Sequence, residues 1–137
     1  MVKIIQMATQ DWLDNKYAIR VYGKGGMSGG RDEHGYHFHI ESVSTRQVLV
    51  VDFFTLELER VEDERGRKVN CFSWSDYTKI RGLLKEWLMK KDVVMDNGKS
   101  IDVTNYQSLA IQWNIENKFS GKELIDWKSL LDVSNKL

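Results

Sequence analysis

The sequence predicts an α+β fold, in which an antiparallel β-sheet from the N-terminal half packs against two or three C-terminal helices. The first half of the chain alternates apolar and polar side chains with the period of strands, whereas the second half repeats apolar side chains at helical spacing. Proline is absent, and no tract is long enough to act as a linker between two domains. We therefore expect residues 1–137 to form a single domain, which is an ordinary size for one core.

Strand signals dominate as far as residue 72. Residues 17–23 and 36–43 alternate aromatic or β-branched residues with others, as half-buried strands do. Residues 47–58 hold a long run of Val, Leu, Phe and Thr, which we interpret as one strand covered on both faces. The charged residues 62–68 contain a glycine and predict a turn, so residues 69–72 would be the return strand of a hairpin.

Helical periodicity begins after residue 73. A first helix is predicted through about residue 91, and a second begins at the capping-box pattern of residues 104–107. The same capping pattern at residues 120–123 predicts a third helix. The inner-face residues of the three helices would be Tyr77, Ile80, Leu84, Trp87 and Leu88, then Leu109, Ala110 and Trp113, then Leu124, Trp127, Leu130 and Leu131.

Between the first two helices, the Asn-Gly pair of residues 96–99 predicts a tight turn. The flanking residues 93–95 and 101–103 are β-branched and apolar enough to form a short hairpin around it.

Composition limits the classes of function. The 20 basic and 20 acidic residues cancel, so charge does not indicate nucleic-acid binding, which requires a basic surplus on one face. No stretch is long and apolar enough to span a bilayer, and residues 1–7 are too short and too polar for a signal peptide. The single cysteine, Cys71, excludes an internal disulfide and fits a reducing compartment. We expect a cytoplasmic, unanchored protein without a membrane partner.

The three histidines of the chain all fall between His34 and His39. In a strand over residues 36–43, His37, His39 and Glu41 share one face, and neighbouring side chains on that face lie about 6–7 Å apart. Tyr36, Phe38 and Ile40 would share the opposite face. We expect the imidazoles to project outward together, which makes this strand the candidate functional surface.

One interpretation of the cluster is a metal site. His34, His37 and His39 would hold a divalent transition metal such as zinc, and Glu33 or Glu41 would act as a general base. A metal bound with an open position lowers the pKa of coordinated water. The simpler alternative is that the histidines bond to backbone groups or to a neighbouring carboxylate, without any ligand.

The glycine-rich residues 23–30 precede the histidines. Successive backbone N–H groups there could bind an anion with Lys24 and Arg31, although the spacing of a dinucleotide or nucleotide loop is absent. The alternative is a flexible loop that closes over the histidine strand or becomes ordered when a partner binds.

Several of these residues resemble the uncharacterised bacterial domain-of-unknown-function family 4160. Arg20-Val21-Tyr22 resembles its first strand, Glu33-His34 its acid-His pair, and His37-Phe38-His39-Ile40-Glu41 its His-Phe-His core. Val51-Asp52 resembles the end of its following apolar strand, and Trp87 its late helical tryptophan. The resemblance covers roughly residues 17–90. Gly35 and Tyr36 replace two prolines of the family pattern.

The resemblance implies a partner-binding protein, because genes of this family often lie beside that of a second small protein, as in toxin–antitoxin pairs. Our leading hypothesis is a small cytoplasmic interaction or regulatory protein of a bacterium or phage. Its protein partner would contact His34, His37 and His39, and Glu33 and Glu41 would tune their charge. The rival hypotheses are a metal-dependent hydrolase or nuclease, and a structural protein of a virus or mobile element that forms a homo-oligomer.

Overall fold

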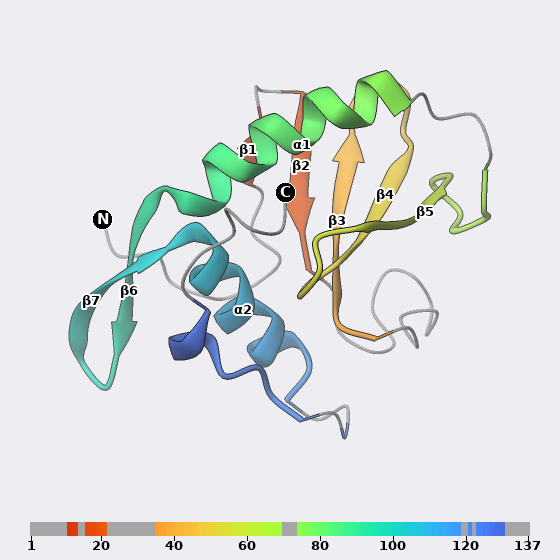
Figure 1. The fold of residues 1–137 in the computed structure, drawn as a ribbon. Coiled ribbons are helices and arrows are strands. Elements are labelled where there is room, and N and C mark those ends of the chain that lie inside the picture. Colours follow the sequence, from red (N-terminus) through yellow and green to blue (C-terminus); the bar gives the residue numbers. More distant parts are fainter. Residues whose placement is uncertain are drawn as a thin grey trace.

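The computed structural model describes residues 11–13, 16–21, 35–69, 74–118, 121 and 123–130, with only the backbone described for 11–13 and 74–76. Their elements form a sheet with two helices on one side, as predicted for an α+β fold (Figure 1). The five-stranded sheet is antiparallel throughout, and its strands lie side by side in chain order. They are β1 (Asp11–Leu13), β2 (Tyr17–Arg20), β3 (His37–Ser42), β4 (Val48–Asp52) and β5 (Leu58–Glu62).

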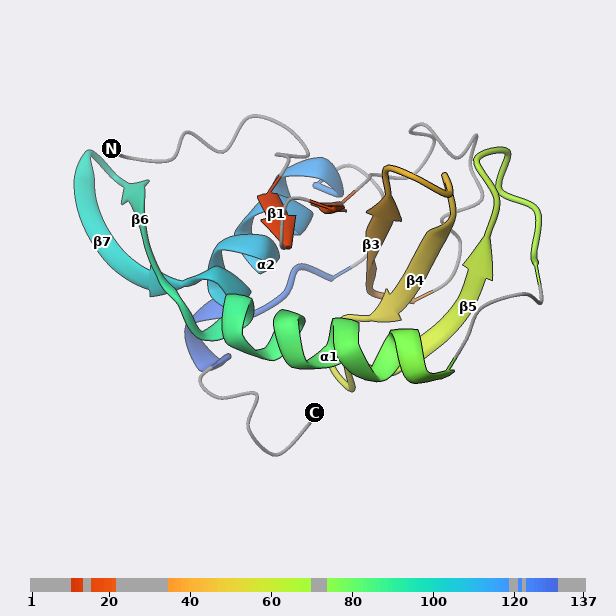
Figure 2. The same ribbon diagram turned by 90° about the horizontal axis from the view of Figure 1, so that it is seen from above.

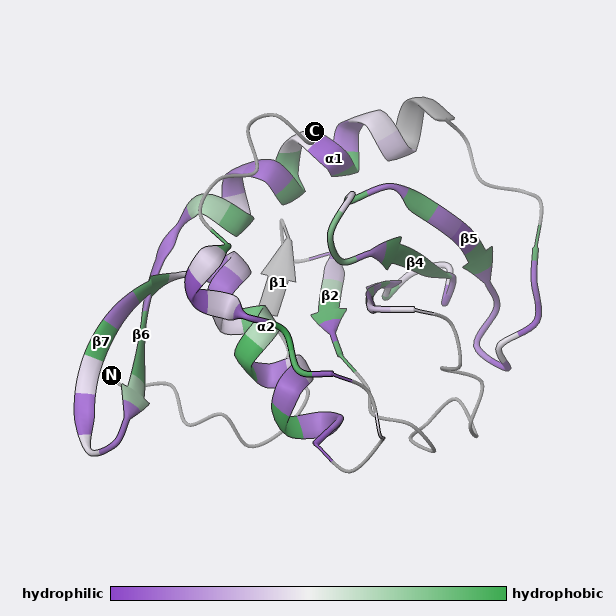
Figure 3. Ribbon diagram, turned by 60° about the horizontal axis from the view of Figure 1, so that its bottom comes forward, coloured by the Kyte–Doolittle hydropathy of each residue, from purple (hydrophilic) through white to green (hydrophobic). Residues whose placement is uncertain are grey.

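Helix α1 (Trp74–Met89) runs along one side of β3, β4 and β5 (Figure 2). Helix α2 (Asn105–Glu116) adds to the same layer, and a short 3-10 helix, η1 (Trp127–Ser129), follows. Hydrophilic and hydrophobic residues alternate along α1, as in a helix that buries one face (Figure 3). None of the helices within the described ranges has both the length and the apolar character needed to cross a membrane.

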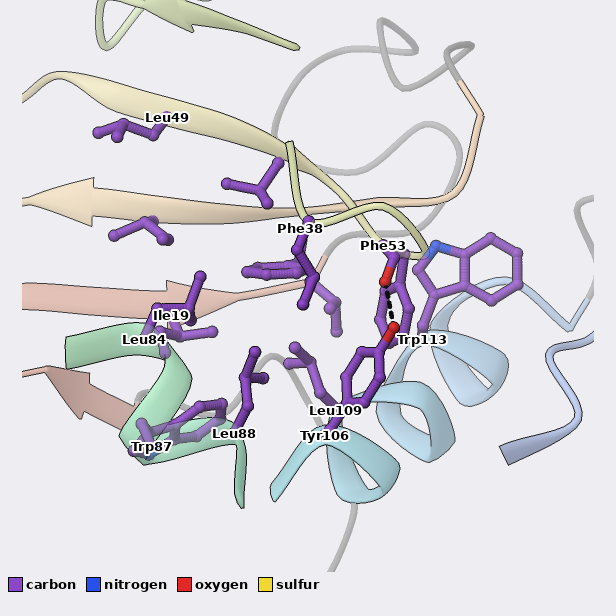
Figure 4. Close-up of a cluster of buried hydrophobic side chains, with 14 of the residues drawn as sticks. Ile19, Phe38, Leu49, Phe53, Leu84, Trp87, Leu88, Tyr106, Leu109 and Trp113 are labelled. Atoms are coloured by element: carbon purple, nitrogen blue, oxygen red, sulfur yellow. Dashed lines mark hydrogen bonds between the residues drawn. The ribbon is translucent and has the colours of Figure 1, made fainter. Parts of the chain in front are cut away.

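The core lies between the helices and one face of the sheet (Figure 4). Phe38 and Ile40 of β3 point into it, as the alternation predicts, and they pair across the sheet with core residues of β4 and β2. Burial of such side chains contributes about 1.5–3 kcal/mol each. The helices contribute the side chains that their spacing predicts, namely Tyr77, Ile80, Leu84, Trp87, Leu88, Leu109, Ala110 and Trp113.

The prediction of one strand over residues 47–58 is wrong. β4 ends at Asp52, the chain turns through residues 53–57, and β5 begins at Leu58. The sequence pattern does not indicate this turn, because Phe53 and Leu56 within it are apolar and fully buried, as strand residues often are. The Asp52 carboxylate starts the turn by accepting hydrogen bonds from the backbone N–H groups of the second and third residues after it.

The preceding turn, residues 42–47, has the same construction. In each turn the fifth residue, Arg46 or Leu56, donates its N–H to the first carbonyl and has φ near +60°. The side chain of the first residue, Ser42 or Asp52, accepts backbone N–H bonds, and so does the threonine three residues later. The turn repeats as Ser/Asp-x-x-Thr-x-Gln/Glu in the sequence.

The charged turn after β5 is confirmed. Asp63 and Arg67 close it through a backbone hydrogen bond, and Glu62 pairs with Lys68 as an antiparallel bridge. The return pairing continues to Val69, whose N–H donates to the carbonyl of Val61 at 2.9 Å. The rest of the predicted return strand lies outside the described residues.

The short hairpin around Asn97-Gly98 is also confirmed. β6 (Lys91–Asp96) and β7 (Lys99–Thr104) form a two-stranded sheet of their own. Both turn residues have positive φ, 51° for Asn97 and 78° for Gly98, which the Asn-Gly pair tolerates well. Thr104 then caps α2 through the predicted capping box with Gln107.

The predicted third helix does not form over the described residues. Residues 123–126 have no regular secondary structure, and η1 is the helical segment described beyond them. The side chain of Asn114 binds both backbone groups of Ile125, which removes those groups from helical hydrogen bonding. Leu124, expected on an inner face, is exposed.

Candidate functional site

Strand β3 holds His37, His39 and Glu41 on the face of the sheet that points away from the helices. The two imidazole rings stack, with their centroids 5.2 Å apart and their planes 26° from parallel. The shared face that the alternation predicts is therefore present. Both side chains are nevertheless buried, at 5% exposure each. The expectation that these rings project outward into solvent is wrong.

Burial follows from the position of β3 inside the sheet. Arg20 of β2 and Val50 of β4 lie directly opposite His39 on its two sides. Asp52 is the partner of His37 on β4. Side chains opposite each other in an antiparallel sheet lie about 4.5–5.5 Å apart at Cβ, so each histidine is shielded by its neighbours.

The tautomer of His37 follows from one hydrogen bond. Its Nδ1 lies 2.9 Å from the carbonyl oxygen of Gly35. A carbonyl can only accept, so Nδ1–H donates, and in a neutral ring the lone pair is then on Nε2. The Nδ1 atom of His39 lies 3.8 Å from Oε2 of Glu41, which is too long for a hydrogen bond but places the carboxylate beside this ring.

Two ion pairs stand on the same face. Arg20 Nη1 lies 3.4 Å from Glu41 Oε1, and the two side chains are 27% and 23% exposed. Glu41 therefore links a half-buried arginine to the buried His39. Arg60 and Glu62 of β5 form the second pair and are more deeply buried. We name these residues the polar face cluster: Arg20, His37, His39, Glu41, Arg60 and Glu62.

Burying so many ionisable groups is costly unless they are paired and hydrogen-bonded. Most side chains of the opposite face are apolar, and Val50 is fully buried within the polar face itself. A polar face built in this way can bind charged or hydrogen-bonding groups of a ligand at its half-buried rim, where Arg20 and Glu41 lie.

Four of the predicted site residues, Lys24, Arg31, Glu33 and His34, lie outside the described residues. Within the part of the chain that the structure describes, no group of three or more His, Cys, Asp or Glu side chains is arranged to hold a metal ion. The structure brings together the other three predicted residues, His37, His39 and Glu41. Their role in binding stays a prediction.

The sequence analysis missed Arg20, Arg60 and Glu62 as members of the cluster. Each lies on a different strand from the histidines, and only the pairing register places it on their face. The register between β4 and β5 also shifts, because Val50 pairs with Arg60 whereas the next residue, Val51, pairs with Leu58. The sequence signal that could have indicated them is that Arg20 and Arg60 stand among residues that otherwise have the pattern of strands.

The fold and the cluster define a small α+β protein that has apolar packing on one sheet face and a histidine-centred polar cluster on the other. Comparisons with protein-family models, curated proteins and solved structures give no match to this chain. The resemblance of the residues around the histidines to family 4160 therefore stays a prediction.

Proposed function

We propose that this chain is a small interaction or regulatory protein whose protein partner binds at the polar face cluster. The observation that carries the proposal is the continuous path from the half-buried Arg20–Glu41 pair to the buried histidine pair. Buried ionisable groups are costly unless they are paired, so this path offers a partner charged groups that are already held in place. A partner would contact the rim, and the histidines would fix the geometry of Glu41.

The cellular setting belongs to the same proposal. The resemblance to family 4160 supports a cytoplasmic protein of a bacterium or phage, with a partner encoded by the neighbouring gene as in a toxin–antitoxin pair. Balanced overall charge supports a protein partner more than a nucleic acid.

The test is a calorimetric titration of the full chain with the protein encoded by the neighbouring gene. Glu41→Gln removes the charge that Arg20 and His39 face and keeps the shape of the side chain. We expect a rise in Kd of about tenfold, because a half-buried charged contact contributes on the order of 1.4 kcal/mol.

The matched control is Glu64→Gln, which removes an exposed carboxylate on the turn after β5 that is paired with Arg46 and does not belong to the polar face cluster. Its Kd should equal that of the unmodified chain. Equal affinities of the Glu41 and Glu64 variants would refute the proposed surface, as would a neighbour protein that does not bind at all.

A second candidate is a metal-dependent hydrolase or nuclease that uses the same histidines. The observation that favours it is the hydrogen bond of His37 Nδ1 with the carbonyl of Gly35, because metal-binding histidines usually orient their second nitrogen in this way. In that case Nε2 of His37 and of His39 would hold a zinc ion together with His34, and Glu33 or Glu41 would act as the general base.

Titration of tag-free protein with zinc separates the two candidates. A metal enzyme should bind one zinc ion, and His37→Gln/His39→Gln should abolish binding while the far-UV circular dichroism is unchanged. Zinc binding that persists in the double variant, or is absent from the unmodified chain, would rule out the metal site.

A further inference from the structure

The turn between β6 and β7 presents an asparagine side chain to solvent. Asn97 and Gly98 are the two turn residues, and both are exposed. Within the part of the chain that the structure describes, neither the side chain of Asn97 nor the N–H of Gly98 makes a hydrogen bond. A side-chain amide and a backbone nitrogen that can attack it are therefore neighbours, and neither group is engaged elsewhere in the fold.

The other asparagines with described positions differ from Asn97. The side chain of each donates a hydrogen bond to a backbone carbonyl, namely Asn105 to Trp87, Asn114 to Ile125 and Asn117 to Trp113. Each of them is also followed by a residue with a large side chain, whereas Asn97 is followed by glycine. Among the described asparagines, Asn97 is thus the one whose amide is exposed, makes no hydrogen bond and precedes a glycine.

A glycine after an asparagine favours one intramolecular reaction. After losing its proton to a solvent base, the backbone nitrogen of Gly98 can attack Cγ of Asn97. A cyclic imide (a succinimide) then forms, the bond from Cγ to Nδ2 breaks, and ammonia leaves. Water opens the ring at either carbonyl, which gives aspartate or isoaspartate.

The surroundings of Gly98 leave room for this attack. Apart from its chain neighbours, no atom lies within 4 Å of the position that a Cβ of Gly98 would occupy. Glycine itself has no Cβ, so no side chain obstructs the approach of its nitrogen to the amide carbon.

Ring closure needs rotation about the Cα–C bond of Asn97, which the folded turn restrains. The restraint is the pairing of Asp96 with Lys99, the last pair of the hairpin. Met95, Lys99 and Ser100 beside the turn are exposed, and β6 and β7 pair only with each other among the described residues. The end of an exposed two-stranded hairpin opens more easily than buried strands do, so the reactive conformation does not require global unfolding.

We propose that Asn97 is a site of spontaneous deamidation, at which water replaces the side-chain amide and isoaspartate forms beside aspartate. In isoaspartate the main chain runs through Cβ and Cγ, which adds one backbone carbon to the turn. Asn97 and Gly98 have φ of 51° and 78°, the left-handed angles of a tight two-residue turn, and the lengthened backbone does not fit that turn. The modification therefore separates the adjoining ends of β6 and β7. The inference does not depend on the polar face cluster.

The test is tryptic peptide mapping of the full chain by mass spectrometry, after incubation in mildly alkaline buffer made with heavy-oxygen water. Cleavage at lysine places Asn97 in the fragment of residues 92–99 and the other three described asparagines in that of residues 100–118. We expect deamidation in the first fragment to be faster by on the order of tenfold or more, because only there does glycine follow asparagine. An unincubated sample, digested in parallel, gives the background.

The first fragment should gain one heavy oxygen atom and contain both isoaspartate and aspartate. Equal rates in the two fragments would overturn the proposal, and a product without isoaspartate would overturn the succinimide route. Gly98→Ala should slow the reaction by about tenfold or more, because the added methyl group obstructs the attack. Alanine is strained at a φ of 78° and favours opening of the turn, which acts in the opposite direction. An undiminished rate in Gly98→Ala would therefore also count against the attack by this nitrogen.

The structural consequence has its own measurement. Hydrogen exchange of the purified isoaspartate form is compared with that of Asn97→Asp, the matched control that adds the same charge with an ordinary backbone. Hydrogen-bonded amides of β6 and β7 should exchange about tenfold faster in the isoaspartate form, whereas Phe38 in β3 should exchange equally in both. Equal exchange of the hairpin in the two forms would show that the added backbone carbon does not separate the strands.

Discussion

At the scale of single residues, two buried tyrosines tie the helices to the turn between β4 and β5. Tyr106 of α2 donates its hydroxyl to the carbonyl of Phe53 at 2.6 Å (Figure 4). Tyr77 of α1 donates to the carbonyl of Leu56 at 3.4 Å. Burial raises the pKa of Tyr106 to about 12 and also raises that of Tyr77. Both phenols therefore act as neutral donors at neutral pH.

The raised pKa of Tyr106 predicts alkaline destabilisation. A pKa that is higher in the folded state favours the protonated form, so its contribution is complete below pH 10 and is lost as pH rises toward 12. Tyr106→Phe should cost about 1 kcal/mol at pH 8, where it removes a hydrogen bond. The difference from the unmodified chain should shrink by pH 11. Urea unfolding at both pH values checks this, and a constant difference would contradict it.

The lowered pKa of Asp63 predicts that its contribution to stability is lost at acidic pH instead of alkaline pH. Its carboxylate accepts the backbone N–H groups of Arg65 and Arg67 and the Nε–H of Arg67. The hydrogen bond from the Arg67 backbone is the largest cause of the lowered pKa of Asp63. The contribution of this carboxylate is present above its ordinary pKa and is lost as pH falls through the lowered value. Asp63→Asn should lower Tm more at pH 7 than at pH 2.5. An equal deficit at both pH values would refute the assignment.

At the scale of elements, the two repeated turns provide a matched pair of substitutions. Arg46 and Leu56 occupy the same turn position with φ of 59° and 60°, yet Arg46 is exposed and Leu56 is buried. The left-handed conformation costs a non-glycine residue roughly 1–2 kcal/mol, and glycine avoids most of that cost. Loss of a buried leucine side chain costs about 2–5 kcal/mol.

These magnitudes predict that glycine substitutions at the two positions change the free energy of unfolding in opposite directions. Arg46→Gly should stabilise the protein by about 0.5–1 kcal/mol, because relief of the backbone outweighs an exposed ion pair with Glu64. Leu56→Gly should destabilise it by about 2 kcal/mol or more, because the lost burial exceeds the relief. Urea denaturation of both variants measures the two effects. A destabilised Arg46→Gly would show that the turn conformation is not the source of strain.

Elements whose signals are local could be predicted from the sequence. The alternation of β3, the Asn-Gly turn at residues 96–99 and the capping box of α2 each depend on residues within a few positions, and all are confirmed. The turn at residues 53–57 was missed because its buried apolar residues imitate a strand. The third helix was predicted wrongly because Asn114 binds both backbone groups of Ile125 and so takes them out of helical hydrogen bonding, and no local pattern encodes that contact.

At the scale of the whole molecule, the two sheets differ in how they are supported. β3 and β4 are inner strands, paired on both sides and packed against the helical layer. β6 and β7 pair only with each other within the described residues and contact α2 along one side. Inner strands with buried neighbours open only with most of the fold, whereas edge segments open locally.

Hydrogen exchange should therefore separate the two sheets. Amides of Phe38, Ile40 and Val50 should exchange at least tenfold more slowly than hydrogen-bonded amides of β6 and β7, because a difference of 1.4 kcal/mol in opening free energy gives that factor. Exchange followed by NMR measures each amide. Equal protection of both sheets would show that the two-stranded sheet of β6 and β7 is as firmly packed as the five-stranded sheet.

The candidate site was predictable only in part, and the reason also lies at this scale. Alternation along β3 is enough to place His37, His39 and Glu41 on one face. The addition of Arg20 from β2 and Arg60 from β5 depends on strand order and on register, including the register shift between β4 and β5. Those properties arise from pairing between distant segments. Burial of the histidines depends on the same pairing, so the sequence pattern alone suggested a solvated face.

The strand order of the main sheet also shapes how the chain is made. Each strand pairs with the strand that precedes it, so the sheet can assemble in sequence while the nascent chain leaves the ribosome. α1 and α2 are synthesised later, and until they leave the ribosome the apolar face of the five-stranded sheet is exposed to solvent. Premature arrest of translation before residue 74 would therefore release an aggregation-prone fragment, which is a substrate for chaperones and proteases.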